Sequence, residues 1–392
     1  MQLQRRLDLS TDINSRSVFL FGPRQTGKTT WLRQLYPRSR WYNLLHGDVF
    51  LRLSRTPGRL RQELAGVTPA EGPVIVDEIQ KLPSLLDDIH ALIEEQGLRF
   101  ILTGSSPVKL RRSGINLLGG RARIRYMMPF VSAEVPDWSL DRAIRFGGIP
   151  SVYLSDDPVQ DLLAYCGAYL QLEVAAEGLV RGIEPFSRFL QVAARCATQQ
   201  IVFEQIASDA QVPARTVREY YQVLVDTLVG VVLEPAQLSG KTGRKPVSHG
   251  KFYLFDNGVA HALAGTIHTA PTGDRYGPAL EHLVFTELRA WLSLRHDPRP
   301  LRFWRTTDGM EVDFVIGTEL AIEIKGSTNL GPRDFRGLVA IQTVQRFARR
   351  VVVCHEPVHR VVDGIDVYPV REFLLLLWAD EFLDKASVTP DR

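Results

Sequence analysis

The 392-residue sequence has few cysteines and no long apolar run. Cys166, Cys196 and Cys354 stand far apart and form no CxxC pair, so we expect reduced thiols that fill cores in an intracellular protein. The longest apolar run, FLLLLW at 373–378, is too short to span a bilayer. The N-terminus, MQLQRRLDLS, lacks the apolar stretch of a signal peptide. These absences predict a cytoplasmic protein with no membrane partner.

An excess of charge of one sign is also missing. The sequence has 47 basic and 44 acidic residues, a formal net charge of +3. This balance permits nucleic-acid binding but does not argue for it, so such a function has to rest on local basic patches. A hydrophobic content of 45% and a charged content of 23% are ordinary for a globular protein with real cores. The length predicts two or three domains.

Short apolar runs alternate with helical patterns in the first part of the chain. The runs SVFLFG, GPVIVDE and RFILTGSS read as buried strands, and TTWLRQLY and SLLDDIHALIEEQG read as helices. This alternation predicts a parallel sheet with right-handed crossovers. We expect the resulting α/β domain to occupy residues 1–150.

The pattern changes after residue 150. The segment 204–229 predicts two short helices joined by a tight turn near residues 210–213, the rhythm of a helix-turn-helix. An apolar run, a basic Gly/Ser-rich tip and a second apolar run then predict a β-hairpin, the wing of a winged helix. We assign this helical region to residues 151–265. A helix followed by alternating strands predicts a third, α/β domain at 266–380, and residues 381–392 form a tail.

The segment FGPRQTGKTT fits the pattern G-x-x-x-x-G-K-[ST] and lies between a predicted strand and a predicted helix. The glycines let the backbone curl so that successive N–H groups face phosphate oxygens, and the helix adds its positive N-terminal end. Lys28 would reach the β- and γ-phosphates, and the Thr29 hydroxyl would ligate Mg²⁺. The residues expected to bind ATP are Gly22, Pro23, Arg24, Gln25, Thr26, Gly27, Lys28, Thr29, Thr30 and Asp77.

Polar side chains end two further strands. Asp77 would orient Mg²⁺ and its waters, and Glu78 would polarise the attacking water. Ser105, with Thr103 as an equal alternative, would sense the γ-phosphate or hold that water, unless it only caps the strand end. Arg121 follows a Gly-Gly pair. It is either an arginine finger that enters a neighbouring subunit's site or part of a solvated basic strand.

Several of these segments resemble the prokaryotic AAA+ ATPases that carry a C-terminal domain of unknown function. VFLFGPRQTGKTTWLRQL, PVIVDEIQKLP, ILTGSS and LLGGRA carry the resemblance, which resumes in GGIPSVYL, KFYLFDNGVAHAL and GPALEHLVFTEL. Thr26 departs from the family, which more often has valine there, but it lies in the variable part of the loop. The resemblance implies ATP, Mg²⁺ and a homo-oligomer such as a hexameric ring, because AAA+ sites usually form between subunits.

Residues 214–228 are the expected recognition helix. Arg215 and Arg218 lie near the start of its outer face, where such helices enter the major groove of DNA. The wing supplies basic residues suited to phosphate contacts: Lys241, Arg244, Lys245 and Lys251. Winged helices also serve as protein-binding modules or spacers, so DNA is the first but not the only partner that this region predicts.

The segment EVDFVIGTELAIEIKG carries acids on two predicted strands. Glu323 and Lys325 share a face because they are two residues apart, and Asp313 can join them across a hairpin. Glu281, on the preceding helix, completes a pattern that resembles PD-(D/E)xK nucleases. In such a site Asp313, Glu323 and Glu281 would hold Mg²⁺, and Lys325 would help to activate water. The alternatives are an exposed ion pair, or a domain that binds DNA or metal without efficient cleavage.

The predicted fold is therefore an AAA+ P-loop parallel-sheet domain, a helical winged-helix domain and a PD-(D/E)xK nuclease-like α/β domain. The first functional hypothesis is an Mg²⁺-dependent ATPase that couples hydrolysis to remodelling or translocation of duplex or branched DNA, with endonuclease activity in the last domain. The alternative is a nucleotide-switched regulatory ATPase. In that case the last domain is a degenerate nuclease-like surface for a protein partner.

Overall fold

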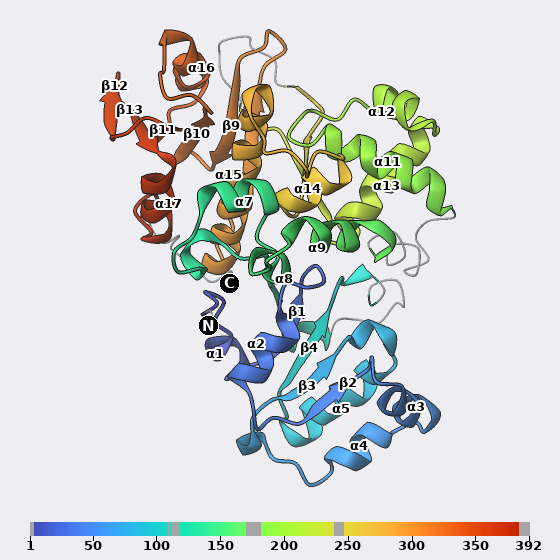
Figure 1. Ribbon diagram of the computed structural model, residues 1–392. Coiled ribbons are helices and arrows are strands. Elements are labelled where there is room, and N and C mark those ends of the chain that lie inside the picture. Colours follow the sequence, from blue (N-terminus) through green and yellow to red (C-terminus); the bar gives the residue numbers. More distant parts are fainter. Residues whose placement is uncertain (1–3, 109, 111–117, 170–181, 239–246, 384–392) are drawn as a thin grey trace. The chain divides into compact units, whose positions relative to one another are not determined.

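The computed structural model describes residues 4–108, 110, 118–169, 182–238 and 247–383, which form two compact units (Figure 1). The N-terminal unit consists of Arg5–Pro129 and Val223–Val229. The C-terminal unit consists of Met1–Gln4, Phe130–Gln222 and Gly230–Arg392.

A five-stranded parallel sheet forms the centre of the N-terminal unit. Its strand order is β2-β3-β4-β1-β5. The strands are β1 (Ser17–Phe21), β2 (Trp41–Asn43), β3 (Val74–Asp77), β4 (Phe100–Gly104) and β5 (Ala122–Tyr126). The helices are α1 (Ser10–Ile13), α2 (Lys28–Leu35), α3 (Gly47–Arg55), α4 (Arg59–Leu64) and α5 (Leu85–Gln96). The three strands and two helices predicted here are confirmed.

Strands β1, β3 and β4 are buried along their whole length, which explains why they read as continuous apolar runs. Phe19, Val76 and Leu102 from these strands share a buried cluster with Leu86 and Ile89 of α5. Because all three strands are parallel, their carboxyl ends meet at one edge of the sheet. The phosphate-loop segment, the two acids and the serines after β4 therefore meet at that edge.

The first part of the C-terminal unit is helical. It contains α7 (Leu140–Phe146), α8 (Pro150–Tyr153), α9 (Pro158–Ala164), α11 (Ile183–Arg195), α12 (Phe203–Ala210), α13 (Ala214–Asp226) and α14 (Asn257–Leu263). Strands β6 (Gly230–Leu233) and β7 (Lys251–Leu254) pair antiparallel. The predicted pair of short helices and the predicted hairpin are thus present, in the predicted order.

The second part of the C-terminal unit is built on a six-stranded mixed sheet, in the order β12-β13-β11-β10-β9-β8. The strands are β8 (Leu301–Arg305), β9 (Glu311–Ile316), β10 (Leu320–Ile324), β11 (Arg349–Cys354), β12 (Arg360–Val362) and β13 (Ile365–Pro369). The helices are α15 (Tyr276–Arg295), α16 (Arg336–Val344) and α17 (Val370–Trp378).

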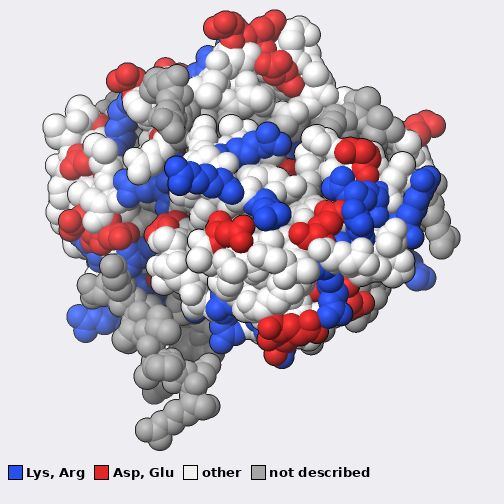
Figure 2. Space-filling model, turned by 90° about the horizontal axis from the view of Figure 1, so that it is seen from below, with Lys and Arg blue, Asp and Glu red and all other residues white. Residues whose placement is uncertain are grey.

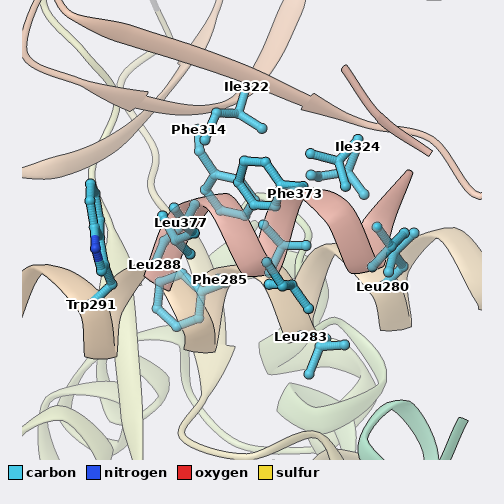
Figure 3. Packing of buried hydrophobic residues seen from close by; sticks show 14 of the residues in the cluster. Leu280, Leu283, Phe285, Leu288, Trp291, Phe314, Ile322, Ile324, Phe373 and Leu377 are labelled. Atoms are coloured by element: carbon cyan, nitrogen blue, oxygen red, sulfur yellow. The ribbon is translucent and has the colours of Figure 1, made fainter. Parts of the chain in front are cut away.

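Helices cover both faces of this sheet. On one face, Phe285 of α15 and Phe373 of α17 pack with Phe314 and Ile322 of the sheet (Figure 3). On the other, Leu338 and Ile341 of α16 share a cluster with the buried residues Val315, Ala321 and Val352. The alternation of strand residues between the two clusters follows from the period of two along a strand.

The first segment of the N-terminal unit ends at Pro129, before the predicted domain boundary at residue 150. Leu140 and Ile144 of α7 share a buried cluster with Leu280 of α15, and the Phe130 amide donates to the Gly148 carbonyl at 2.7 Å. The segment after Pro129 therefore packs with the C-terminal unit. Apart from Val223–Val229, the regions 151–265 and 266–380, predicted as separate domains, lie together in that unit.

The predicted tail begins too early. Phe382 and Leu383, which were assigned to it, are buried in the same cluster as Phe373. Phe382 packs against Phe373 with 5.0 Å between ring centroids. Residues 384–392 lie outside the described part of the chain.

Candidate functional site

The loop between β1 and α2 has a backbone that only particular residues can adopt. A Cβ on Gly22 would lie 2.3 Å from the carbonyl oxygen of Met127, so a side chain there would clash with the backbone. Gly27, which precedes α2, has φ +90°, a left-handed conformation that favours glycine. The Thr26 hydroxyl donates to the Pro23 carbonyl at 2.9 Å and fixes the curve of the loop. The loop thus has the shape that a phosphate-binding loop needs.

Lys28 and Thr29 begin α2 and place two different functional groups at this loop. The Lys28 ammonium is buried and donates to the carbonyls of Gly22 at 2.6 Å and Pro23 at 3.0 Å. Its positive charge therefore lies at the loop, where the phosphates of a nucleotide would bind. The Thr29 hydroxyl donates to Oδ2 of Asp77 at 2.9 Å and connects the loop to the end of β3.

Asp77 is held from two sides at the end of β3. Its Oδ2 accepts from Thr29, and its Oδ1 accepts from the hydroxyl of Thr103 on β4. The same Thr103 hydroxyl oxygen accepts from the Glu78 amide at 3.3 Å. A hydroxyl and a carboxylate that face each other are hard oxygen ligands of the kind that Mg²⁺ prefers. The residues present therefore fit a magnesium ion, which Thr29 and Asp77 would hold.

Glu78 follows Asp77 in a strained backbone conformation. Its φ of +62° and ψ of +45° lie in the left-handed region, which costs a residue with a Cβ about 1–3 kcal/mol. The Glu78 carboxylate is buried and accepts from the side-chain amide of Gln80. The same amide nitrogen lies 3.3 Å from the Ser105 hydroxyl, to which it donates. Gln80 thus joins the predicted catalytic base to the predicted sensor.

Sequence reasoning missed Gln80. The available signal was a polar residue two positions after Glu78, in a segment that the structure buries. Gly104, at the end of β4, leaves room for the amide, because a Cβ there would lie 2.6 Å from Oε1 of Gln80. The contacts of Gln80 are non-local in part, and no spacing in the sequence shows them.

We expect Gln80→Leu to lower kcat for ATP hydrolysis by about 10- to 100-fold, because hydrogen bonds to charged groups contribute about 1.5–3 kcal/mol. KM for ATP is expected to stay within about threefold, since the Gln80 amide donates to Glu78 and Ser105, which lie outside the phosphate loop. Gln62→Leu, at an exposed position of α4, is the matched control. An unchanged kcat in Gln80→Leu would show that Glu78 needs no such support.

Arg121 pairs with a residue of its own unit. Its guanidinium contacts Glu94 of α5, and both side chains are partly exposed. Exposed ion pairs of this kind contribute about 0–1 kcal/mol, so the pair can open at little cost. The role of arginine finger in a neighbouring subunit stays a prediction.

The C-terminal acids form two separate groups. Lys251, the first residue of β7, lies among Glu311 at 2.6 Å, Glu281 at 3.0 Å and Asp313 at 3.4 Å, measured from its ammonium nitrogen to a carboxylate oxygen. Glu323 is paired with its own lysine, Lys325, at 2.6 Å. The two groups are in contact through Asp313, whose Oδ2 accepts from the Ile324 amide at 2.8 Å. The structure therefore brings the predicted acids near one another, but with two lysines among them.

The prediction that Lys251 contacts DNA phosphates from the wing is wrong. Only 4% of its side chain is exposed, and its ammonium is enclosed by three carboxylates. The reason is that β7 is buried along its whole length, so its first residue points into the C-terminal unit and not to the basic tip of the hairpin. The other predicted wing residues, Lys241, Arg244 and Lys245, lie outside the described residues.

Burial and neighbouring opposite charges shift the pKa values of the residues in the C-terminal cluster in opposite directions. Burial raises the pKa of Glu281 to about 7, although Lys251 counteracts it. Burial and the neighbouring Asp313 raise the pKa of Glu323 well above its ordinary value. For Lys251 burial alone would lower the pKa, but the surrounding carboxylates outweigh burial and raise it. Lys251 therefore carries its positive charge at neutral pH.

The predicted Mg²⁺ site of Glu281, Asp313 and Glu323 does not fit this arrangement. Lys251 and Lys325 already neutralise these carboxylates. Among the described residues, no group of three or more His, Cys, Asp or Glu side chains is arranged to hold a metal ion. Glu311 and Lys251 were both missed as members of the cluster. Glu311 was accessible to sequence reasoning, because it lies two residues before Asp313 on the same strand.

Of the predicted DNA-contacting residues that the structure describes, Arg215 and Arg218 are exposed. The Arg215 side chain is 91% exposed and pairs with Glu219 at 3.2 Å. The Arg218 guanidinium lies 4.6 Å from the ring centroid of Phe203. Val217, between them in the sequence of α13, is fully buried. The two arginines therefore lie on the solvent side of the helix, as predicted from its pattern.

On the face shown in Figure 2, basic and acidic side chains are intermixed. This agrees with the near-neutral net charge of the chain. A long apolar helix of the kind that spans a membrane is not found in any described segment.

Comparison with known proteins supports the assignment of the N-terminal unit. Residues 14–135 match the family described as an AAA domain. Residues 137–269 and 276–373 match two domains of unknown function, DUF8612 and DUF4143. No curated protein matches the sequence at a significant level. The phosphate loop, the paired acids, the parallel sheet and the match together support a P-loop ATPase of the AAA type.

Two solved structures show partial similarity. The Walker-type ATPase of Pyrococcus abyssi is 15% identical, with 66% of this chain and 95% of that chain covered, at a TM-score of 0.46. The ORC1 protein of Aeropyrum pernix in complex with DNA is 16% identical, with 64% and 86% covered, at a TM-score of 0.25. At TM-scores below 0.5, neither similarity informs the function of this chain.

Proposed function

We propose that the protein is an Mg²⁺-dependent ATPase whose N-terminal unit hydrolyses ATP. The observation that carries this proposal is a continuous path of hydrogen bonds at one sheet edge. It runs from Thr29 of the loop through Asp77 and Thr103 to Glu78. Gln80 extends it from Glu78 to Ser105. The phosphate loop, the two acids and the residues that end β4 thus lie at one edge of the sheet.

In the proposed reaction the loop amides and Lys28 bind the phosphates of ATP. Magnesium, when bound, would neutralise charge on the phosphate oxygens, held by Thr29 and Asp77. Glu78 accepts a proton from the attacking water, and the Gln80 amide orients its carboxylate. In this proposal the Ser105 hydroxyl contacts the terminal phosphate or that water. Arg121 of a neighbouring subunit would complete the site in a homo-oligomer.

We further propose that ATP hydrolysis is coupled to DNA. The support is the pair of helices α12 and α13 followed by the β6–β7 hairpin, with Arg215 and Arg218 exposed at the start of α13. Arginines at this place can contact phosphates or base edges in the major groove. DNA remodelling or translocation is the activity that an ATPase joined to such a module would perform.

The double variant Arg215→Ala/Arg218→Ala is expected to weaken binding of duplex DNA. The slope of log K against log salt concentration should fall in magnitude by about 2, because each phosphate contact contributes about 0.9. Fluorescence anisotropy at several salt concentrations measures this slope, with the exposed Arg346→Ala as the matched control. A double variant with the wild-type slope would remove α13 from the DNA interface.

The coupling itself is tested by ATP turnover with and without duplex, forked and junction DNA. We expect at least one DNA form to stimulate turnover by the wild type but not by Glu78→Gln. Turnover that is indifferent to every DNA form would contradict the coupling and leave the ATPase intact. Slow turnover, no DNA binding at low salt and a stable protein partner would favour the alternative, a nucleotide-switched regulatory ATPase.

The arrangement of the C-terminal acidic cluster favours a domain that binds DNA over one that cleaves it. Metal-dependent cleavage would need Glu281 and Asp313 to be free to ligate a cation, and both contact Lys251. Endonuclease activity is therefore the weaker form of the proposal. Endonuclease activity would be supported if the wild type nicks DNA and the Lys325→Ala variant does not.

A further inference from the structure

A single buried lysine joins three elements of the C-terminal unit. Lys251 comes from β7 of the hairpin, Glu281 from α15, and Glu311 and Asp313 from β9. Its ammonium nitrogen lies 2.6–3.4 Å from one oxygen of each acid. Tyr253, two residues further along β7, donates its hydroxyl to Glu281, and its ring stacks on Phe285 with 4.0 Å between centroids. The hairpin is therefore attached to the acids by a charge and by a neighbouring aromatic residue.

The three carboxylates surround the ammonium as ligands surround a metal ion. Mg²⁺ needs oxygen ligands at about 2.0–2.1 Å and Ca²⁺ at about 2.3–2.6 Å, so either ion would have to take the position of the ammonium nitrogen. The lysine and a divalent cation would repel each other at such a distance. They are mutually exclusive occupants of the same carboxylate set.

Glu323, the third predicted ligand, does not relieve this exclusion. Glu323 pairs with Lys325, so the acids of the predicted metal site are divided between two lysines. Lys325 is the less enclosed of the two, with 28% of its side chain exposed and a single paired carboxylate. Only the Lys251 position has three carboxylates around one cation.

We propose that Lys251 is the resident cation of this acidic centre. It occupies the place of a divalent metal, excludes metal from the wild-type protein, and fastens the β6–β7 hairpin to α15 and β9. The acidic centre then has a mechanical role. A movement of the β6–β7 hairpin would move the C-terminal sheet, because Lys251 connects the two through its ion pairs. The inference does not depend on ATP hydrolysis.

The test uses Mn²⁺ alone as the probe and full-length protein without nucleotide. All proteins carry Asp77→Asn, which removes the carboxylate ligand of the proposed magnesium site in the N-terminal unit. Bound Mn²⁺ is measured by electron paramagnetic resonance in this parent, in Asp313→Asn, in Lys251→Ala and in Lys251→Ala/Asp313→Asn. Lys325→Ala is the matched control, because it frees only one paired carboxylate.

We expect no Asp313-dependent Mn²⁺ in the parent, one Mn²⁺ gained in Lys251→Ala, and its loss when Asp313→Asn is added. Lys325→Ala should gain none. Two results would overturn the proposal. The first is that the parent binds Mn²⁺ and loses it when Asp313→Asn is added. The second is that Lys251→Ala folds but binds no additional Mn²⁺. If Lys251→Ala does not fold, the comparison of the parent with Asp313→Asn still decides whether the wild-type cluster holds a metal, and bound Mn²⁺ there would overturn the proposal.

Discussion

Glu78→Gln is expected to slow ATP hydrolysis by about 10²- to 10⁴-fold, the usual contribution of a general base. The substitution keeps the shape of the side chain but removes the group that accepts a proton from water. Nucleotide affinity should change little, because the phosphate loop and Lys28 are untouched. Phosphate release at saturating ATP measures the rate, and binding of a fluorescent ATP analogue measures the affinity.

The matched control is Glu184→Gln, at a position on α11 where 87% of the side chain is exposed. It should hydrolyse ATP at the wild-type rate. If Glu78→Gln also hydrolyses normally, Glu78 is not the base, and its strained backbone and its contact with Gln80 need another explanation.

Lys251→Met is expected to destabilise the C-terminal unit by about 3–5 kcal/mol, because removal of one partner leaves buried charges without compensation. Methionine keeps the apolar stem of the side chain, so the loss measures the ammonium and not the packing. Denaturant unfolding followed by tryptophan fluorescence reports on this unit, where Trp291 and Trp304 are buried.

Lys325→Met is the control for this experiment, since Lys325 is partly exposed and pairs with a single carboxylate. Its expected cost is about 1 kcal/mol or less. A Lys251→Met protein with a free energy of unfolding within about 1 kcal/mol of the wild type would show that the cluster contributes little to stability.

The sequence predicted which residues meet at the edge of the N-terminal sheet, because these residues come from local signals. The glycines, Lys28 and Thr29 are contiguous. Asp77 and Glu78 end a buried strand whose neighbours could also be recognised from their apolar runs. Parallel strands then bring these segments to one edge without further information. Gln80 escaped prediction because its role depends on the contact with Ser105 across the sheet.

The C-terminal cluster was harder to predict because its members are far apart in the chain. Lys251 lies in a segment with a basic tip, and this pattern predicts a surface position. Only the tertiary structure shows that β7 is buried and that its lysine meets Glu281 and Asp313. The sequence identified the acids correctly as neighbours, but it did not show which cation they hold.

The most direct test of the account is nucleotide binding by the purified wild type and by Lys28→Ala, measured by titration with a fluorescent ATP analogue in the presence of Mg²⁺. We predict saturable binding by the wild type and a large loss of affinity in the variant, because Lys28 supplies the positive charge at the phosphate loop. A wild type that binds no adenine nucleotide, or a variant with unchanged affinity, would contradict the proposed ATPase.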